Sequence, residues 1–333
     1  MSRKLAIAVN WQGNLDVKRM IAQAEIADAA GVDSIWVAEA WGRDAFTLLA
    51  ILADHTKRVR LASSIVNTYS RTPAALAQHF ATLDEVSGGR MIVGLGTSGP
   101  QVIEHFHGVR FEPALTRLKE YVDIIDMLMA GVPLNYNGKI FKLNRGFKLR
   151  FEPPRKHIPI FIASLNRKSV EFTAQRADGW LPVLIPMSQL RSAIGDLRAM
   201  ATAAGRDASA IEVKSPGVVH VTSNVARSRA SLAGNIAFYI ARMGTFYGEQ
   251  LTRWGWSEAI KPVREAWDAN GSKAGAEAVP AKLVDELGYS GGIEGAIERL
   301  RQQEEAGVDI HSIEVDAGGD NRALERDLRA LVG

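Results

Sequence analysis

Residues 94–100 read GLGTSGP and directly follow the apolar run Met91–Val93. The glycines at positions 94, 96 and 99 match the spacing G-x-G-x-x-G, which is typical of a dinucleotide-binding turn. That turn belongs after the first strand of a doubly wound sheet and opens a helix at once. Here it follows the fourth strand-like run of the chain, and Pro100 comes directly after the last glycine. The position of the motif therefore argues against a dinucleotide-binding fold.

Strand-like and helix-like runs alternate along the whole chain. The segment AGVDSIWV (30–37) recurs as AGVDIHSIEV (306–315), although any connection from a helix to a parallel strand tends to have this form. The recurrence at both ends of an eightfold alternation predicts an α/β fold, a (β/α)8 TIM barrel forming a single domain over residues 1–333. The expected strands are Leu5–Val9, Ser34–Ala38, Arg60–Val66, Arg90–Leu95, Ile160–Ala163, Gly179–Val183, one within Ile211–Val221, and His311–Val315.

Two insertions interrupt this alternation. Near residues 131–157, apolar runs flank Asn137-Gly138, which predicts a hairpin with a two-residue turn. Near residues 225–290 the pattern is helical. The tryptophans of this second insertion either shape a wall or lid over the substrate or belong to a core; they are Trp254, Trp256 and Trp267.

The composition excludes several functions. Forty basic and 37 acidic residues leave a net charge of +3 without a basic stripe, so we expect no nucleic-acid partner. The absence of cysteine excludes disulfides and thiolate metal sites. No apolar run approaches the roughly 20 residues of a membrane helix, and the N-terminal stretch MSRKLAIAVNWQGN reads as a strand rather than a signal peptide. We therefore expect a cytoplasmic protein with no membrane partner.

The carboxyl ends of the strands are where a barrel of this kind carries its chemistry. Strand one ends in Asn10-Trp11, and strand two ends in Glu39-Ala40-Trp41. These ends hold aromatic rings, hydroxyls, amides and glycines, but no cluster of His, Asp and Glu at metal-ligand spacing. They also lack a serine with an obvious His/Asp pair, so neither a metal site nor acyl transfer is expected.

Three of these positions suggest a role. Gly96 to Gly99 let backbone amides approach a ligand, or form a plain tight turn. Arg167 and Lys168 stand in the first turn of an expected helix, where cations oppose the helix dipole; they indicate a bound anion or are simply solvated. Glu39 is a candidate general acid or base, a polar contact to a ring, or part of a structural salt bridge.

Two histidines follow the glycine turn. His105 and His107 fall in an expected loop, where a hydrogen bond that anchors the loop is the simplest role for an imidazole.

The sequence resembles the bacterial luciferase-like flavin-dependent oxidoreductases, most of all the branch that uses the deazaflavin coenzyme F420. The resemblance covers roughly residues 5–200, and the C-terminal third is generic. The combination SGGR-x-x-x-GLGTSGPQ is its most specific part. The segments that carry it are WVAEAWGRDAFTLLA (36–50), SSIVNTYSRTPAALAQ (63–78), ATLDEVSGGRMIVGLGTSGPQVIEHFHGV (81–109) and IPIFIASLNRKSVEFTAQRADGWLP (158–182).

This resemblance implies a luciferase-like barrel with a tricyclic ring across its strand ends. It implies a cis peptide bond between Ser64 and Ile65, in a bulge that supports the back of the ring. The glycine turn would contact the polar chain of the cofactor, and the turn after strand five would face its phosphate, with Lys168 as counter-ion. The cofactor-binding residues so expected are Ser64, Ile65, Val66, Asn67, Gly96, Thr97, Ser98, Gly99, Pro100, Ala163, Ser164, Leu165 and Lys168.

One departure from the family pattern bears on catalysis. Relatives often carry a histidine at the end of strand two, where this chain has Glu39-Ala40. Glu39 is therefore the candidate catalytic residue, unless the substrate needs only hydride transfer with a proton from water. The functions that remain open are a coenzyme F420-dependent oxidoreductase acting on a small organic substrate, an FMN-dependent two-component monooxygenase, and a non-catalytic cofactor-binding protein. The resemblance also implies a homodimer packed through Phe46–Ala53 and Ala74–Leu83.

Overall fold

The structure is a computed structural model that describes residues 2–9 and 13–333. It contains two compact units. One comprises Ala8–Ser164 with Arg176–Trp180 and is called the 8–164 unit below; the other comprises Met1–Ile7, Leu165–Gln175 and Leu181–Gly333 and is called the 181–333 unit. The predicted end of strand one, Asn10-Trp11, lies outside the described residues.

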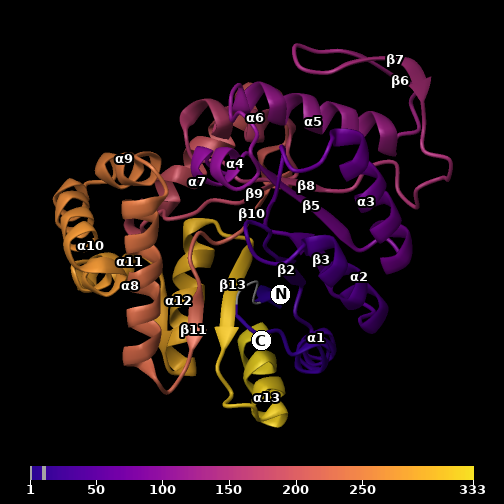
Figure 1. The fold of residues 1–333 in the computed structure, drawn as a ribbon. Coiled ribbons are helices and arrows are strands. Elements are labelled where there is room, and N and C mark those ends of the chain that lie inside the picture. Colours follow the sequence, from indigo (N-terminus) through magenta and orange to yellow (C-terminus); the bar gives the residue numbers. More distant parts are fainter. Residues whose placement is uncertain (1, 10–12) are drawn as a thin grey trace. The chain divides into compact units, whose positions relative to one another are not determined.

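A parallel sheet forms the centre of the 8–164 unit. Its strand order is β9-β8-β5-β3-β2, and each strand pairs in parallel with its neighbours. Helices α1, α2 and α3 lie along one side of β2 and β3 (Figure 1). The strands are β2 (Ser34–Val37), β3 (Arg60–Ser63), β5 (Met91–Gly96), β8 (Ile160–Ile162) and β9 (Gly179–Trp180), and the helices are α1 (Val17–Ala30), α2 (Ala45–His55), α3 (Pro73–Ser87) and α5 (Ala114–Met129).

Local sequence signals account for the ends of these helices. Asp16, Asp44 and Thr72 are the N-caps of α1, α2 and α3, and each side chain accepts a hydrogen bond from a backbone N–H of the first turn. Gly31 and Gly88 end α1 and α3 in the left-handed conformation, which glycine adopts without strain. The strands of this unit therefore lie close to the predicted ranges, because the helices around them begin and end at their capping residues.

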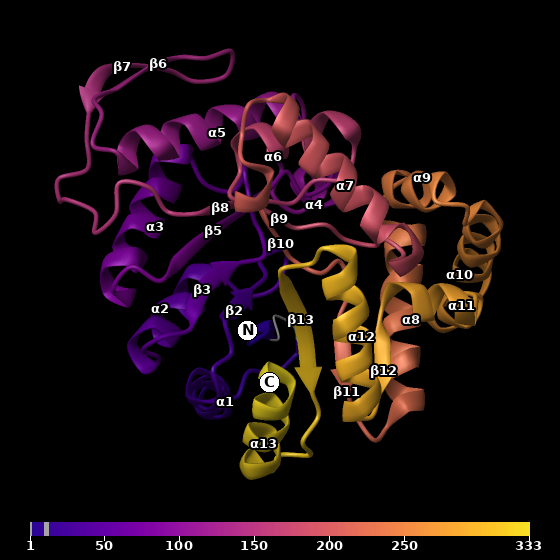
Figure 2. The ribbon, with the colours of Figure 1, turned by 180° about the vertical axis from the view of Figure 1, so that it is seen from behind.

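The 181–333 unit holds a second set of parallel strands, in the order β1-β13-β11-β12. Figure 2 shows β13, β11 and β12 of this set. The strand expected within Ile211–Val221 is divided into β10 and β11, and β10 is followed by a single bridge from Lys214 to Ile310 of β13. The strands are β1 (Lys4–Val9), β10 (Glu212–Val213), β11 (Val219–Val221), β12 (Tyr289–Gly291) and β13 (Ile310–Val315). The closure of all strands into one (β/α)8 barrel stays a prediction.

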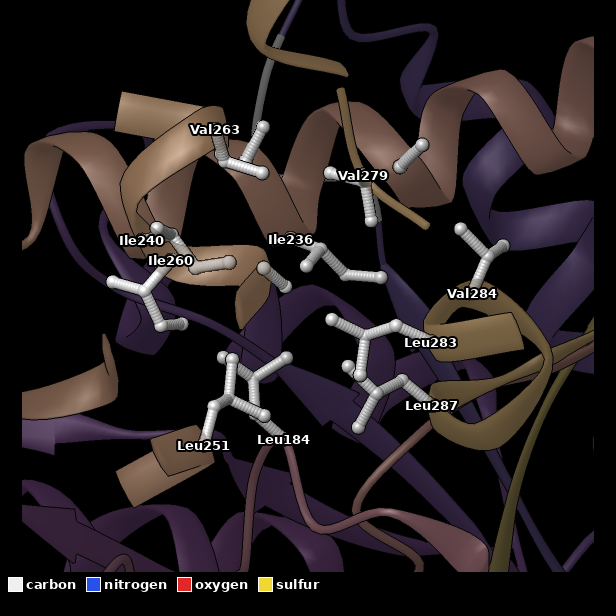
Figure 3. Close-up of a cluster of buried hydrophobic side chains, with 13 residues drawn as sticks. Leu184, Ile236, Ile240, Leu251, Ile260, Val263, Val279, Leu283, Val284 and Leu287 are labelled. Atoms are coloured by element: carbon white, nitrogen blue, oxygen red, sulfur yellow. The ribbon is translucent and has the colours of Figure 1, made fainter. Parts of the chain in front are cut away.

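Helices make up most of the 181–333 unit, and the insertion near 225–290 has its own apolar core (Figure 3). Side chains of α8, α9, α10 and α11 meet there, including Ile236, Ile240 and Leu283, which are fully buried. Trp254, Trp256 and Trp267 are partly buried and pack against this core, as in the second of the two alternatives. The helices are α6 (Arg167–Arg176), α7 (Met187–Ala203), α8 (Val225–Arg242), α9 (Phe246–Arg253), α10 (Ser257–Glu277), α11 (Ala281–Leu287), α12 (Ile293–Ala306) and α13 (Asn321–Val332).

The hairpin near 131–157 is present, but its predicted two-residue turn is wrong. β6 (Leu134–Asn137) pairs with β7 (Lys142–Phe147), so that residues 138–141 form the loop. The buried carboxylate of Glu120 accepts hydrogen bonds from the backbone N–H groups of Lys139, Ile140 and Phe141. Because this carboxylate satisfies the loop amides, the loop does not need the tight turn that Asn-Gly favours.

Candidate functional site

The third strand breaks where the family resemblance implies a bulge. β3 ends at Ser63, the Ser64–Ile65 peptide bond is cis as predicted, and β4 (Val66–Asn67) resumes the pairing with β5. The Ser63 hydroxyl donates to the carbonyl oxygen of Gly94 at 2.8 Å and accepts from its N–H at 3.0 Å. A side chain thus replaces the ladder bonds that the bulge interrupts, and both backbone groups of Gly94 stay satisfied.

The two strand glycines are required by close packing. A Cβ on Gly94 would lie 1.7 Å from the Ser63 carbonyl oxygen, so no other residue fits. A Cβ on Gly96 would lie 3.0 Å from Ile65 Cδ1 and 3.2 Å from Ala163 Cβ. The tips of three neighbouring strands therefore meet at Gly96, Ile65 and Ala163, and we call these three residues the platform. Its members come from three separate segments of the chain and are all predicted site residues.

The predicted residues of the bulge differ in how far a ligand can reach them. Ser64, Ile65 and Ala163 are half-buried, whereas Val66 is 0% and Asn67 is 1% exposed. Val66 and Asn67 therefore hold the bulge from inside, and only the half-buried residues are within reach of a ligand.

The turn after the bulge is tied to its surroundings at several points. Asn67 Oδ1 accepts hydrogen bonds from the backbone N–H groups of Tyr69 and Ser70, at 2.9 and 2.8 Å. Thr68 is fully buried, and its N–H donates to the Gly96 carbonyl oxygen at 3.2 Å. Because the turn is fastened both to Asn67 and to the end of β5, the platform beside it is held in place.

The glycine turn leaves β5 with an unusual backbone. Ser98 has a φ of 57°, in the left-handed region that few non-glycine residues occupy, and its side chain is exposed. Thr97 and Gly99 are half-buried, and Pro100 is the first residue of the short helix α4 (Pro100–His105). The predicted loop at His105 is therefore wrong, because Pro100 fits the first helical turn and starts a helix there.

The second histidine after the glycine turn does anchor its surroundings. His107 follows the end of α4, and its Nε2 lies at hydrogen-bond distance, 3.4 Å, from Asn67 Nδ2. The amide of Asn67 therefore links the bulge to the segment after the glycine turn.

Glu39 lies in an ion pair, one of the alternatives for this residue. Its Oε1 accepts from Arg71 Nη1 at 2.5 Å and its Oε2 from Arg71 Nη2 at 3.2 Å, and Oε2 also accepts from the Ala45 N–H at 2.9 Å. The Glu39 side chain is only 9% exposed. A proton on Glu39 would displace one of these bonds, so the geometry supports a positioning role better than proton donation.

The guanidinium of Arg71 organises the surroundings of Glu39. It also contacts Asp44 at 2.5 Å and lies 4.8 Å from the centre of the Phe46 ring. The imidazole of His79 stacks on the same Phe46 ring, with 4.4 Å between the ring centres. Although His79 is among the exposed residues of α3, partial burial of its ring, together with the nearby Arg71 charge, lowers the pKa of His79, which keeps this imidazole neutral at pH 7.

The residues after strand five are divided between the two units. Ser164 is buried in the 8–164 unit, where its carbonyl oxygen accepts from Trp180 Nε1 at 2.8 Å. Leu165 is half-buried and Lys168 is exposed, and both belong to the 181–333 unit at the start of α6. The platform, the glycine turn and Ser164 therefore belong to the 8–164 unit, whereas Leu165 and Lys168 belong to the 181–333 unit.

Sequence reasoning missed one titratable group. Lys214 follows β10 and donates a hydrogen bond to Ser312 Oγ at 2.5 Å. Burial lowers the pKa of Lys214 to about 8. An isolated lysine between Val213 and Ser215 carries no sequence signal, because only the bridge to β13 places it among buried groups.

Comparison with known proteins identifies the family. The model of the luciferase-like monooxygenase family matches residues 7–310. The chain belongs to that family. It is therefore an oxidoreductase of the luciferase-like class.

Three relatives illustrate the range of this family. A Mycobacterium tuberculosis protein named as a putative coenzyme F420-dependent oxidoreductase is 32% identical, over 99% of both chains. The coenzyme F420-dependent tetrahydromethanopterin reductase of Methanopyrus kandleri has a similar fold, with a TM-score of 0.84, 18% identity, and 100% and 98% of the two chains covered. The oxygenating part of 3,6-diketocamphane monooxygenase from Pseudomonas putida, solved with FMN, has a TM-score of 0.67, 18% identity, and 100% and 97% covered.

Proposed function

We propose that this protein is a coenzyme F420-dependent oxidoreductase that moves a hydride between C5 of the deazaflavin and a small organic substrate. The observation that carries the proposal is the 32% identity, over 99% of both chains, to a protein named for dependence on this coenzyme. The FMN-dependent monooxygenase is the second candidate, and the fold that the chain shares with an FMN-containing oxygenase favours it.

The platform fits a flat ring. Glycine and alanine are the two smallest amino acids. Gly96 and Ala163 therefore present no long side chain next to the half-buried Ser64 and Ile65. When bound, the deazaflavin supplies the hydride chemistry, and the protein supplies orientation and electrostatics. We propose that Ser64 and Ile65 back the ring and that Thr97 and Ser98 contact the polar chain. Lys168 would serve as a counter-ion for the phosphate.

Titration of the purified protein with the deazaflavin coenzyme and with FMN, followed by fluorescence, tests the choice of cofactor. We expect saturable binding of the deazaflavin and weaker binding of FMN. Tighter binding of FMN without binding of the deazaflavin would reject the proposal. In that case, oxygen uptake dependent on reduced FMN would support the monooxygenase.

A charge variant tests the counter-ion. We expect Lys168→Gln to weaken deazaflavin binding by about tenfold, because one charge-assisted contact to a phosphate is lost. Lys18→Gln is the matched control, since Lys18 is an exposed lysine of α1 and no predicted site residue. Equal affinities of the two variants would remove Lys168 from the site and leave the cofactor assignment intact.

A further inference from the structure

Residues 139–156 form a strongly basic stretch of the chain. This segment, called the basic segment below, contains seven lysines and arginines and a single acidic residue, Glu152. It includes β7 and the return towards β8, and it lies beside the end of α5 in both views (Figures 1 and 2). The near-neutral net charge of the whole chain conceals this local excess.

Six of the seven cations are exposed, and none of these six forms an ion pair with another residue in the described part of the chain. The exception is Arg155, whose guanidinium is held by the buried carboxylate of Asp84. The ion pair with Asp84 therefore gives Arg155 a structural role, and among the residues that the structure describes no ion pair gives such a role to the six exposed cations. The exposed cations are Lys139, Lys142, Arg145, Lys148, Arg150 and Lys156.

An exposed aromatic ring stands among these cations. The register of the hairpin shifts between Leu134 and Asn135, which pair with Phe147 and Asn144, and Gly146 has a φ of 62°. This bulge precedes Phe147, a residue that is 73% exposed. A ring this exposed is unfavourable in water, and in the sequence it lies between the cations Arg145 and Lys148.

Close to this ring in the sequence, Lys148 is one of the residues that line a depression of about 470 Å³. Apolar side chains from the end of α5 and from the basic segment line it, together with three of the exposed cations and with Glu152, the one acidic residue of the segment. Cations near a helix C-terminus interact favourably with the helix dipole, which accounts for these three. It does not account for the other three, Lys139, Lys142 and Arg145, which are on the hairpin.

We propose that the basic segment is a peripheral contact site for an anionic lipid surface, with Phe147 entering the interface and the exposed cations facing the lipid phosphates. Lysine and arginine clusters attract anionic headgroups, and an apolar ring such as that of phenylalanine can bury itself at the boundary between headgroups and acyl chains. Long side chains without acidic partners suit a diffuse surface of charge, whereas a folded acidic partner would need a shaped contact.

Two other occupants fit less well. A second copy of this chain, docked symmetrically on the same segment, would bring two sets of like charges together. Single-stranded nucleic acid is bound by a series of stacked rings along a charged groove, and the basic segment exposes one ring. Within the described residues no helix has the length and apolarity to cross a bilayer. The expectation of no membrane partner rested on the lack of such a span and of a signal peptide, and neither bears on peripheral binding.

Sedimentation of the full chain with vesicles tests the proposal. The vesicles are made of phosphatidylcholine alone, or of phosphatidylcholine with phosphatidylglycerol. We expect binding only to the vesicles that contain phosphatidylglycerol, and we expect it to weaken as salt increases. The double variant Lys142→Gln with Lys148→Gln should bind roughly tenfold to thirtyfold more weakly.

Matched variants separate this site from general charge effects. Lys18→Gln with Lys57→Gln removes two exposed lysines elsewhere in the same unit and should change binding by less than about twofold. Phe147→Trp should retain binding and Phe147→Ser should weaken it, while circular dichroism confirms folding. Equal binding by the two double variants, equal binding to both kinds of vesicle, or binding of a single-stranded oligonucleotide in place of vesicles would each overturn the proposal.

Discussion

Single residues at the candidate site act mainly through the partners that folding brings to them. Glu39 meets Arg71 from a distant segment, and Ser63 replaces the backbone bonds that the bulge interrupts. The sequence showed which residues stand at strand ends, because strand ends are marked by changes of residue type. It could not show that Arg71 pairs with Glu39, because that contact depends on the packing of α2 and α3.

Replacement of Glu39 distinguishes a positioning role from a catalytic one. We expect Glu39→Gln to lower the free energy of unfolding by about 1–3 kcal/mol, because the partly buried Arg71 loses one of its two charged partners and keeps only Asp44. Removing Arg71 as well, in Glu39→Gln with Arg71→Met, should restore part of the loss. A rate that falls by about a hundredfold with unchanged stability would instead make Glu39 the acid or base.

The pH dependence of stability has a source at His157. Hydrogen bonds with Asp126 and Asp178 raise the pKa of this imidazole to about 10. An imidazole whose pKa is raised on folding stabilises the protein below its ordinary pKa of about 6.5, and this contribution is lost as the pH rises through about 10. We therefore expect the difference in melting temperature between the wild type and His157→Gln to shrink as the pH rises from about 6 to about 10. A constant difference would show that His157 acts through packing.

At the scale of helices and strands, Arg90 has a structural role that its place in the family motif did not reveal. Arg90, the last residue of the family motif SGGR, donates to four backbone carbonyl oxygens, those of Ala53, Thr56, Val59 and Ser87. This part of the resemblance is therefore structural, because it fastens α2 and α3 to the strands they precede. The glycine spacing at 94–99 is likewise explained in part by strand packing.

Replacement of Gly94 tests the close packing between β5 and the end of β3. We expect Gly94→Ala to lower the free energy of unfolding by about 3 kcal/mol or more, since the new Cβ would overlap the Ser63 carbonyl oxygen. Gly195 is the matched control, because it lies in helix α7 with no atom of another element within 4 Å of its Cβ position. Gly195→Ala should raise stability by about 0.5–1 kcal/mol. Urea unfolding of both variants measures the two effects.

The whole molecule combines two compact units, whose parallel strands support the predicted α/β class and the family's fold. The homodimer stays a prediction at this scale. In the helices that the resemblance places at its interface, most apolar side chains are already buried within the chain. The exposed residues there are Thr47, Ala50, Gln78, His79 and Thr82.

A dimer through these helices would therefore use small and polar contacts. Sedimentation velocity should show a species of twice the 36.2 kDa of the chain. We expect Ala50→Arg to shift the protein towards the monomer, because a long charged side chain disturbs a small-residue contact. A wild-type protein that remains monomeric at high concentration would refute the predicted dimer.

The sequence by itself determined the class of fold and most of the order of strands and helices, since these depend on local periodicity and on capping residues. It missed the short helix α4 and the short strand β12, which stands in a region expected to be helical. It also determined the family, because the motifs are specific. Only the tertiary structure decided which strand-end residues are open to a ligand and which are buried, that Glu39 is paired with Arg71, and that the hairpin loop is held by Glu120. These depend on contacts between segments far apart in the chain, and no local pattern encodes such contacts.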